Sequence, residues 1–156
     1  MQRRRWGVLL LTAYISGCLR MTEPQSSETA SDSGSDTAFE IRYADENGTL
    51  QAVVDSTDVA TASAPREEAN SYAVTITLTE PAAERLVSAL RNVGAFEIPS
   101  EHPIFVYFAG QNVYSFQLSR DLVESMENGD FQNDPRLVIA LENEEIARDI
   151  SDTLQK

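Results

Sequence analysis

Near the middle of the chain, the pattern of apolar and polar residues predicts a strand that leads directly into a helix. In residues 72–79, apolar side chains alternate with alanine and threonine, as in a strand with one buried face. Apolar residues then recur three or four positions apart, which is typical of one face of a helix: Ala83, Leu86, Val87, Leu90 and Val93. Pro81 suits the first helical turn and Gly94 suits the position just past the last. Both elements therefore have an apolar side that the rest of the chain must cover.

Further strands and helices are predicted on both sides of this unit. Before it, we expect a hairpin (39–43 and 49–54, joined by a turn at 45–48), an extended segment (56–64) and a polar loop (65–70). After it, we expect a central strand (104–108), a turn (109–112), a returning strand (113–118), a helix (120–128) with Ser119 as its N-cap, a strand (136–141) and a last helix capped by Asn143. This order predicts an α+β fold of ferredoxin-like type, in which helices pack on one face of an antiparallel sheet and a β-hairpin precedes it.

The N-terminus is predicted to be a signal peptide, residues 1–17, that ends in a lipidation site. Three arginines precede an apolar run, residues 6–17, that is shorter than the roughly 20 residues needed to span a bilayer. The run ends in Ile15-Ser16-Gly17-Cys18, which resembles the lipobox of prokaryotic lipoproteins. We therefore expect lipid at Cys18 and a lipid-anchored protein on the extracytoplasmic face of the cell membrane. The alternative is an incidental free thiol, and the arginines leave both Sec and twin-arginine export open.

Residues 18–38 are predicted to be a disordered, acidic tether rich in Ser and Thr, between the lipid and a folded domain at 39–156. The segment has too few large apolar residues to offset the entropy of ordering it. Asn47-Gly48-Thr49 permits glycosylation, although a turn is the simpler interpretation.

The charge of the chain restricts its partners. The net charge is −13 at pH 7, and Lys156 is the only lysine. Such a surface repels nucleic acid, so no nucleic-acid partner is expected. Simple solubility is one reason for this charge; a salt-adapted source, haloarchaeal in our interpretation, is the favoured one.

Candidate catalytic chemistry is sparse. His102 has no second His or Cys near it in sequence, which argues against a metal site. Arg120 is a lone candidate for binding a phosphate, as a small phosphohydrolase would require, and no Gly-rich loop accompanies it. A solvated acidic face is the expected role of the carboxylates that follow: Asp121, Glu124, Glu127 and Asp130. We therefore expect no enzymatic activity, no cofactor and no metal.

Residues 53–154 resemble the large extracytoplasmic head region of SecD, the protein-export subunit that works with SecF. The resemblance lies in four segments: Asp58–Ala62, Ala73–Glu84, Val106–Ser115 and Asn143–Ile150. It departs from the family after Ser115, where Phe116-Gln117 replaces a frequent proline. No transmembrane helix follows Lys156 in the sequence, so the resemblance implies a stand-alone head domain that cannot itself use an ion gradient.

The resemblance implies a binding module that assists protein export or handles emerging unfolded chains. Its expected partners are the membrane, through the lipid at Cys18, together with unfolded exported polypeptide or a SecD/SecF-type translocase. The expected contact residues are the aromatic side chains Tyr107, Tyr114 and Phe116, which offer a large apolar area. The alternative for these residues is a place in the core. The alternative for the protein is a binding lipoprotein of unrelated function on the same fold.

Overall fold

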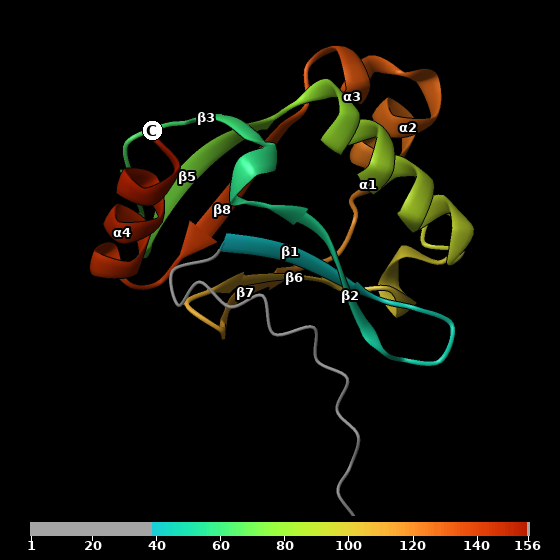
Figure 1. The fold of residues 1–156 in the computed structure, drawn as a ribbon, viewed down its shortest axis with the longest axis horizontal. Helices are drawn as coiled ribbons and strands as arrows, with labels where there is room; N and C mark the ends of the chain where they lie inside the picture. The colour runs from blue at the N-terminus through green and yellow to red at the C-terminus, as the bar shows by residue number, and fades with distance from the viewer. Residues whose placement is uncertain (1–38, 156) are drawn as a thin grey trace, which may run out of the picture. The chain divides into compact units, whose positions relative to one another are not determined.

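The structure, a computed structural model, describes residues 39–155 of the chain. The predicted signal peptide at 1–17, the lipidation site at Cys18 and the tether at 18–38 lie outside the described residues. Within residues 39–155, the predicted strands and helices occur in the predicted order (Figure 1).

The first sheet has the strand order β2-β1-β6-β7, with every pair antiparallel. Its strands are β1 (Phe39–Ala44), β2 (Leu50–Asp55), β6 (Ile104–Phe108) and β7 (Gln111–Phe116). The predicted hairpin is β1 with β2, and the Asp45 carboxylate closes its turn by accepting hydrogen bonds from the N–H groups of Asn47 and Thr49, each at 2.9 Å. As predicted, 104–108 is a central strand, since β6 lies between β1 and β7.

The second sheet is built around β5, the strand of the alternating pattern. Its strands are β3 (Val59–Ala62), β4 (Arg66–Glu68), β5 (Ser71–Leu78) and β8 (Arg136–Leu141). β8 pairs with β5 on one side, while β3 and β4 pair with opposite ends of β5. The residues of β5 at even positions face the same way as Leu137, Ile139 and Leu141 of β8, because they are their partners in the register.

Four α-helices and two 3-10 turns complete the fold. They are α1 (Glu80–Asn92), α2 (Arg120–Asn128), α3 (Asp130–Asn133), α4 (Glu144–Leu154), η1 (Ser56–Asp58) and η2 (Pro99–Glu101). The predicted caps are in place: Ser119 Oγ accepts a hydrogen bond from Leu122 N at 3.2 Å, and Gly94 follows α1 with φ of 79°. Figure 1 shows α1, α2 and α3 on one side of the first sheet, and no described helix on its other side.

One hydrophobic cluster joins both sheets to the helices. It includes Phe39 and Val106 of the first sheet, Ile76 and Ile139 of the second, and apolar residues of all four helices. One buried polar side chain also connects the elements: Ser151 Oγ of α4 donates to Ser63 O, after β3, at 2.9 Å. Burial of these apolar side chains provides the main stabilisation of the fold.

The predicted α+β class is confirmed, and the arrangement is consistent with a ferredoxin-like fold. The strands nevertheless form two sheets and not the single sheet expected, because β7 and β8 approach one another without backbone pairing. Two local expectations were also wrong. The segment predicted as a polar loop contains β4, whose polar side chains suit an edge strand, and β7 begins at Gln111 because the preceding turn is only two residues long.

Candidate functional site

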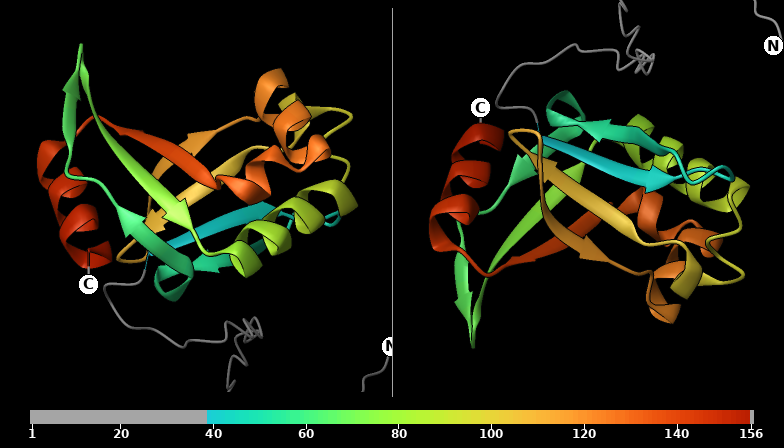
Figure 2. Two further views of the ribbon diagram at one scale, coloured as in Figure 1. Left: turned by 90° about the horizontal axis from the view of Figure 1, so that it is seen from above. Right: turned by 90° about the horizontal axis from the view of Figure 1, so that it is seen from below.

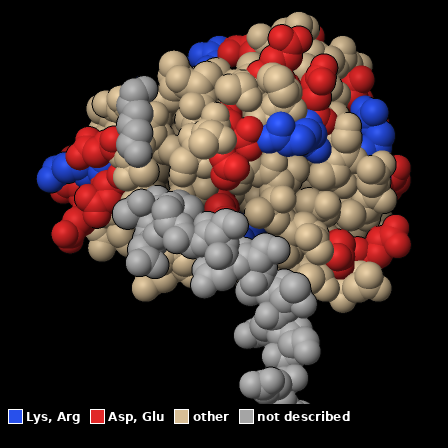
Figure 3. Space-filling view, in the orientation of Figure 1, with Lys and Arg blue, Asp and Glu red and all other residues tan. Residues whose placement is uncertain are grey.

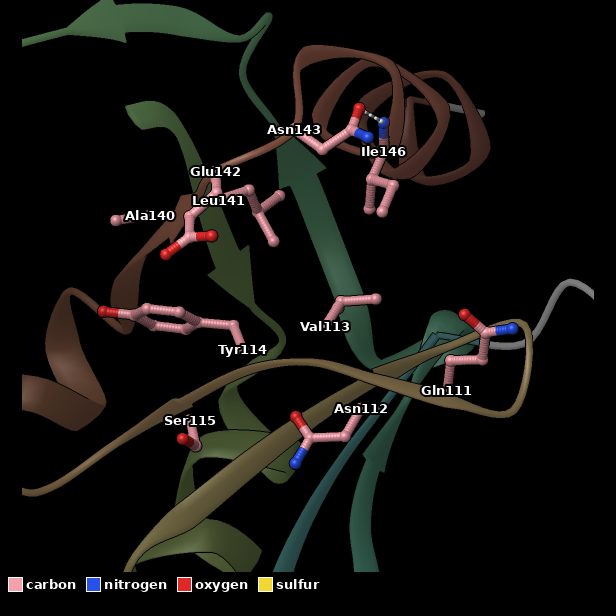
Figure 4. Close-up of a pocket in the computed structure, with 10 residues that line it drawn as sticks. All are labelled: Gln111, Asn112, Val113, Tyr114, Ser115, Ala140, Leu141, Glu142, Asn143 and Ile146. Carbon is pink, nitrogen blue, oxygen red and sulfur yellow. Dashed lines mark hydrogen bonds between the residues drawn. The ribbon is translucent and has the colours of Figure 1, made fainter. Parts of the chain in front are cut away.

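A groove lies where β7 and β8 separate. Its volume is about 720 Å³, and its walls come from β7 on one side and from the end of β8 and the start of α4 on the other. Figure 2 shows β7 and β8 diverging toward the end of the domain at which α4 lies. The lining residues are Gln111, Asn112, Val113, Tyr114, Ser115, Ala140, Leu141, Glu142, Asn143 and Ile146 (Figure 4).

The β6–β7 hairpin sets the position of the β7 wall. Its turn consists of Ala109 and Gly110, both with positive φ, at 50° and 74°. Positive φ at both central residues is the mark of a type I′ turn, whose twist matches that of an antiparallel pair. A bulge follows at Val113, where the register with β6 shifts, and bulges increase the local twist of a strand. Such a twist is consistent with the divergence of β7 from β8.

The start of α4 sets the opposite wall. Asn143 Oδ1 accepts hydrogen bonds from Glu145 N at 2.8 Å and Ile146 N at 3.3 Å, so the residue predicted as a cap is the cap. This cap fixes the first turn of α4 and places the Ile146 side chain in the groove (Figure 4). The wall is therefore formed by a rigid helix start and the buried end of β8.

The three aromatic residues expected to bind polypeptide are divided between two faces of the first sheet. Tyr114 lines the groove and stacks on Phe116, with ring centroids 5.9 Å apart and planes inclined by 23°. Both rings are half-buried and pack against the core, which was the alternative expected for them. Val106 is the register partner of Tyr114 and shares its face, so Tyr107, the next residue along the strand, lies on the opposite face. On that face, the Arg42 guanidinium lies 4.5 Å from the Tyr107 ring centroid. Only Tyr114 lines the groove.

Several residues of the groove were not singled out by the sequence. Glu142 follows the last strand, and its exposed carboxylate supplies negative charge to a wall whose other side chains are neutral. Val138 of the same strand lies outside the lining of the groove, and it is exposed by 58% although the strand is almost entirely apolar. A strand with apolar residues on both faces is typical of one that is covered on both faces. The sequence of residues 136–141 therefore predicts cover on both faces, and the exposure of Val138 shows that the described residues leave one side of the strand uncovered.

A second hollow contains Arg120, the candidate phosphate ligand. Its volume is about 710 Å³, and three carboxylates share its lining with Arg120: Glu97, Glu124 and Glu127. This negative charge opposes the binding of a phosphate. The carboxylates after Arg120 are exposed, as expected of a solvated acidic face.

The carboxylates whose pKa values are lowered accept hydrogen bonds in turns. The backbone hydrogen bond from Thr49 lowers the pKa of Asp45, and the hydrogen bond from the Thr57 hydroxyl lowers the pKa of Asp55. Within residues 39–155, no three His, Cys, Asp or Glu side chains are grouped so as to hold a metal ion. No helix of that region is long and apolar enough to cross a membrane.

The face of the domain that Figure 3 shows is mainly acidic and neutral. In Figure 3, carboxylates are spread over the face shown, with few arginines between them. Most of the arginines that form ion pairs do so with a carboxylate nearby in sequence, as in Arg148 with Glu144 at 2.6 Å. Arg85 of α1 instead binds Asp58 of η1 at 2.6 Å, which joins two separate elements. Cationic and neutral segments therefore suit this surface better than anionic ones.

Comparison with known proteins gives one partial similarity. The chain is 32% identical over 91 residues to the protein-export membrane protein SecD of Methanolacinia petrolearia. The aligned part is 58% of this chain and 19% of that SecD, so the chain spans about a fifth of its relative. No family model matches the chain, and no solved structure matches it. The similarity supports a SecD-like domain, related to protein export, within this chain.

Proposed function

We propose that this protein is a lipid-anchored, extracytoplasmic module that binds extended segments of exported polypeptides. The observation that carries the proposal is the 32% identity to a protein-export membrane protein. The groove between β7 and β8 supports it, because its lining combines the large aromatic side chain of Tyr114 with apolar and polar side chains, which can contact both the side chains and the backbone of an extended segment.

The predicted lipobox supports the location. Lipid at Cys18 would hold the domain near the membrane, where a SecD/SecF-type translocase releases its clients. Mass spectrometry of the mature N-terminus tests this anchor, since lipidation adds a diacylglycerol mass to a peptide that begins at Cys18. An unmodified cysteine, or an uncleaved leader, would contradict the anchor without affecting the proposed binding.

The role we propose is binding, without catalysis. The hollow beside Arg120 supports this choice, because its three carboxylates disfavour the phosphate substrate that the enzymatic alternative needs. Incubation of the purified protein with a panel of phosphate esters tests it, and turnover that Arg120→Ala abolishes would overturn it.

Crosslinking in living cells tests the binding itself. A photoreactive amino acid at position 114 would report what enters the groove, and the same amino acid at the exposed position of Glu84 on α1 serves as the control. We expect position 114, and not position 84, to capture newly exported chains. Equal capture from the two positions, or capture of lipid alone, would contradict the proposal.

The partial similarity keeps a second candidate, a binding lipoprotein unrelated to export. The observation in its favour is that the aligned segment covers only 19% of SecD. Capture of one specific folded protein at position 114, with no nascent chains, would favour this candidate.

A further inference from the structure

β8 has an open edge whose backbone groups have no strand partner among the described residues. β8 pairs with β5 on one side only. Leu78 N donates to Pro135 O at 2.9 Å, so these two residues are a hydrogen-bonded pair. In an antiparallel ladder, hydrogen-bonded pairs alternate with pairs that are not hydrogen-bonded. The uninterrupted register then directs the backbone groups of residues 137, 139 and 141 toward β5. The N–H and C=O groups of Val138 and Ala140 point away from it.

The hydrogen bonds of β5 confirm this alternation independently. Thr75 is the partner of Val138 in the register, and it bonds in the opposite direction: its carbonyl accepts from Ser63 N at 2.8 Å, and its N–H donates to Ser63 Oγ at 2.9 Å. Thr75 therefore does not use its backbone groups on Val138. The outward groups of β8 are free to pair with another strand.

The open edge also lacks the usual protection against strand pairing. Natural edge strands are commonly shielded by lysine, proline, charged side chains or a bulge. The edge of β7 has a bulge, but β8 has an unbroken register, and its charged residue Arg136 lies at its first position. Val138, in the middle of β8, is the most exposed of the large apolar side chains in the described region, at 58%. This edge is both apolar and competent for hydrogen bonding.

We propose that an extended polypeptide segment binds by adding a strand to the open edge of β8, inside the groove between β8 and β7. This inference rests on the proposed function and specifies how the client is held. The backbone groups of Val138 and Ala140 pair with the backbone of the client, a mode that accepts many sequences because it uses main-chain atoms. Ala140 lines the groove and Val138 does not, so the open edge of β8 leads into the cleft at Ala140.

The lining of the groove defines the class of segment that fits. Val113 and Ile146 offer apolar contacts, and alternate side chains of an added strand point to the same face. Glu142 at the mouth, on a chain of net charge −13, favours a cationic residue in the client. The preferred client is an extended segment that alternates apolar with polar residues and carries Lys or Arg.

A pair of synthetic peptides tests the pairing. The probe is a fluorescent eight-residue peptide that alternates valine with lysine, and its control carries N-methyl groups on alternate amides, which remove donors and leave the side chains unchanged. Fluorescence anisotropy with the purified full chain measures both affinities. We expect the N-methylated peptide to bind at least tenfold more weakly. Equal binding of the two would overturn strand addition, while crosslinking from position 114 would still decide the proposed function.

Two substitutions in the protein test whether the outward N–H of Ala140 binds the client. Ala140→Pro removes an outward N–H without removing a hydrogen bond to β5, and proline is tolerated at such edge positions. Ala140→Ser retains the N–H and is the control. We expect the proline variant to bind the peptide at least tenfold more weakly than the serine variant, and equal binding by the two variants would overturn the proposal. If Ala140→Pro fails to fold, Val138→Pro changes the next outward N–H, and the methylated peptide gives a result that depends on neither variant.

The oligomeric state of the protein, with and without the peptide, distinguishes binding of a client at the β8 edge from binding of a second copy there. Sedimentation analysis with and without the peptide should show a monomer in both. A dimer that the peptide dissociates would overturn the proposal in favour of a second copy on this edge. Binding that is seen only after deletion of residues 19–38 would overturn it in favour of the chain's own segment.

Discussion

The turn between β6 and β7 offers a paired test of backbone strain next to the groove. Ala109 has φ of 50° and Gly110 has φ of 74°, and the flanking residues Phe108 and Gln111 are partners in the register. A type I′ turn favours Asn-Gly at these two positions. We therefore expect Ala109→Asn to stabilise the protein and Gly110→Ala to destabilise it.

The structure sets the size of both effects. A left-handed conformation costs an ordinary residue about 1–2 kcal/mol relative to glycine. No atom lies within 4 Å of a Cβ built at Gly110, so Gly110→Ala adds no clash and should cost only that conformational energy. Asn adopts positive φ more readily than Ala, and Ala109→Asn should therefore raise the free energy of unfolding by about 1 kcal/mol. For a domain of this size, that is a rise in Tm of roughly 3–5 °C.

Urea unfolding of the full chain, followed by circular dichroism, measures both changes. Ala109→Ser is the matched control, because Ser is polar like Asn but has less tolerance of positive φ. The slope of the transition should stay constant while the midpoint moves, since the surface exposed on unfolding is unchanged. The strain argument is wrong if Ala109→Asn is no more stable than Ala109→Ser.

Three further predictions concern the folded domain. Asp55→Ala should lower stability by about 1 kcal/mol at pH 7, because it removes the η1 cap. Folding lowers the pKa of Asp55 below 3.8, so the stabilisation by its carboxylate is full above pH 3.8 and is lost as the pH falls through the folded-state pKa. The urea midpoints of the two proteins should therefore converge in acid and not in base. Ser151→Ala should cost about 1–2 kcal/mol, because the Ser63 carbonyl loses its donor, and urea unfolding would contradict this if the midpoint stayed the same. Leu90→Ala should cost about 2–5 kcal/mol by opening a cavity in the core, whereas Glu84→Ala on the exposed side of α1 should change stability by less than about 0.5 kcal/mol in the same assay; similar losses would mean that α1 is not packed as described.

The client-binding proposal gives the split sheet a physical role. A continuous sheet would have satisfied the edges of β7 and β8 with one another and left no room between them. β7, which has a bulge, does not pair with β8, and the open edge of β8 lies beside a cleft. A protein with such an edge binds extended chains at the risk of self-association. The acidic surface opposes that risk, since copies of a strongly charged chain repel one another.

The elements themselves could be predicted from the sequence because their signals are local. The bounds of β8 match the prediction, and Ser119 and Asn143 are the caps that were expected. A cap depends on a side chain and on N–H groups two or three residues away, and strand alternation depends on neighbouring residues. The α+β class followed from the order of these elements.

The division into two sheets and the groove between them could not be predicted in this way. Whether β7 pairs with β8 depends on the twist that a bulge at Val113 adds, and on two strands that are separated in sequence by α2 and α3. Tyr107 and Tyr114 resemble each other in sequence, but the register with β6 places them on opposite faces. Register and pairing between strands are properties of the assembled backbone and not of any single segment, so only the tertiary structure determined which residues line the groove.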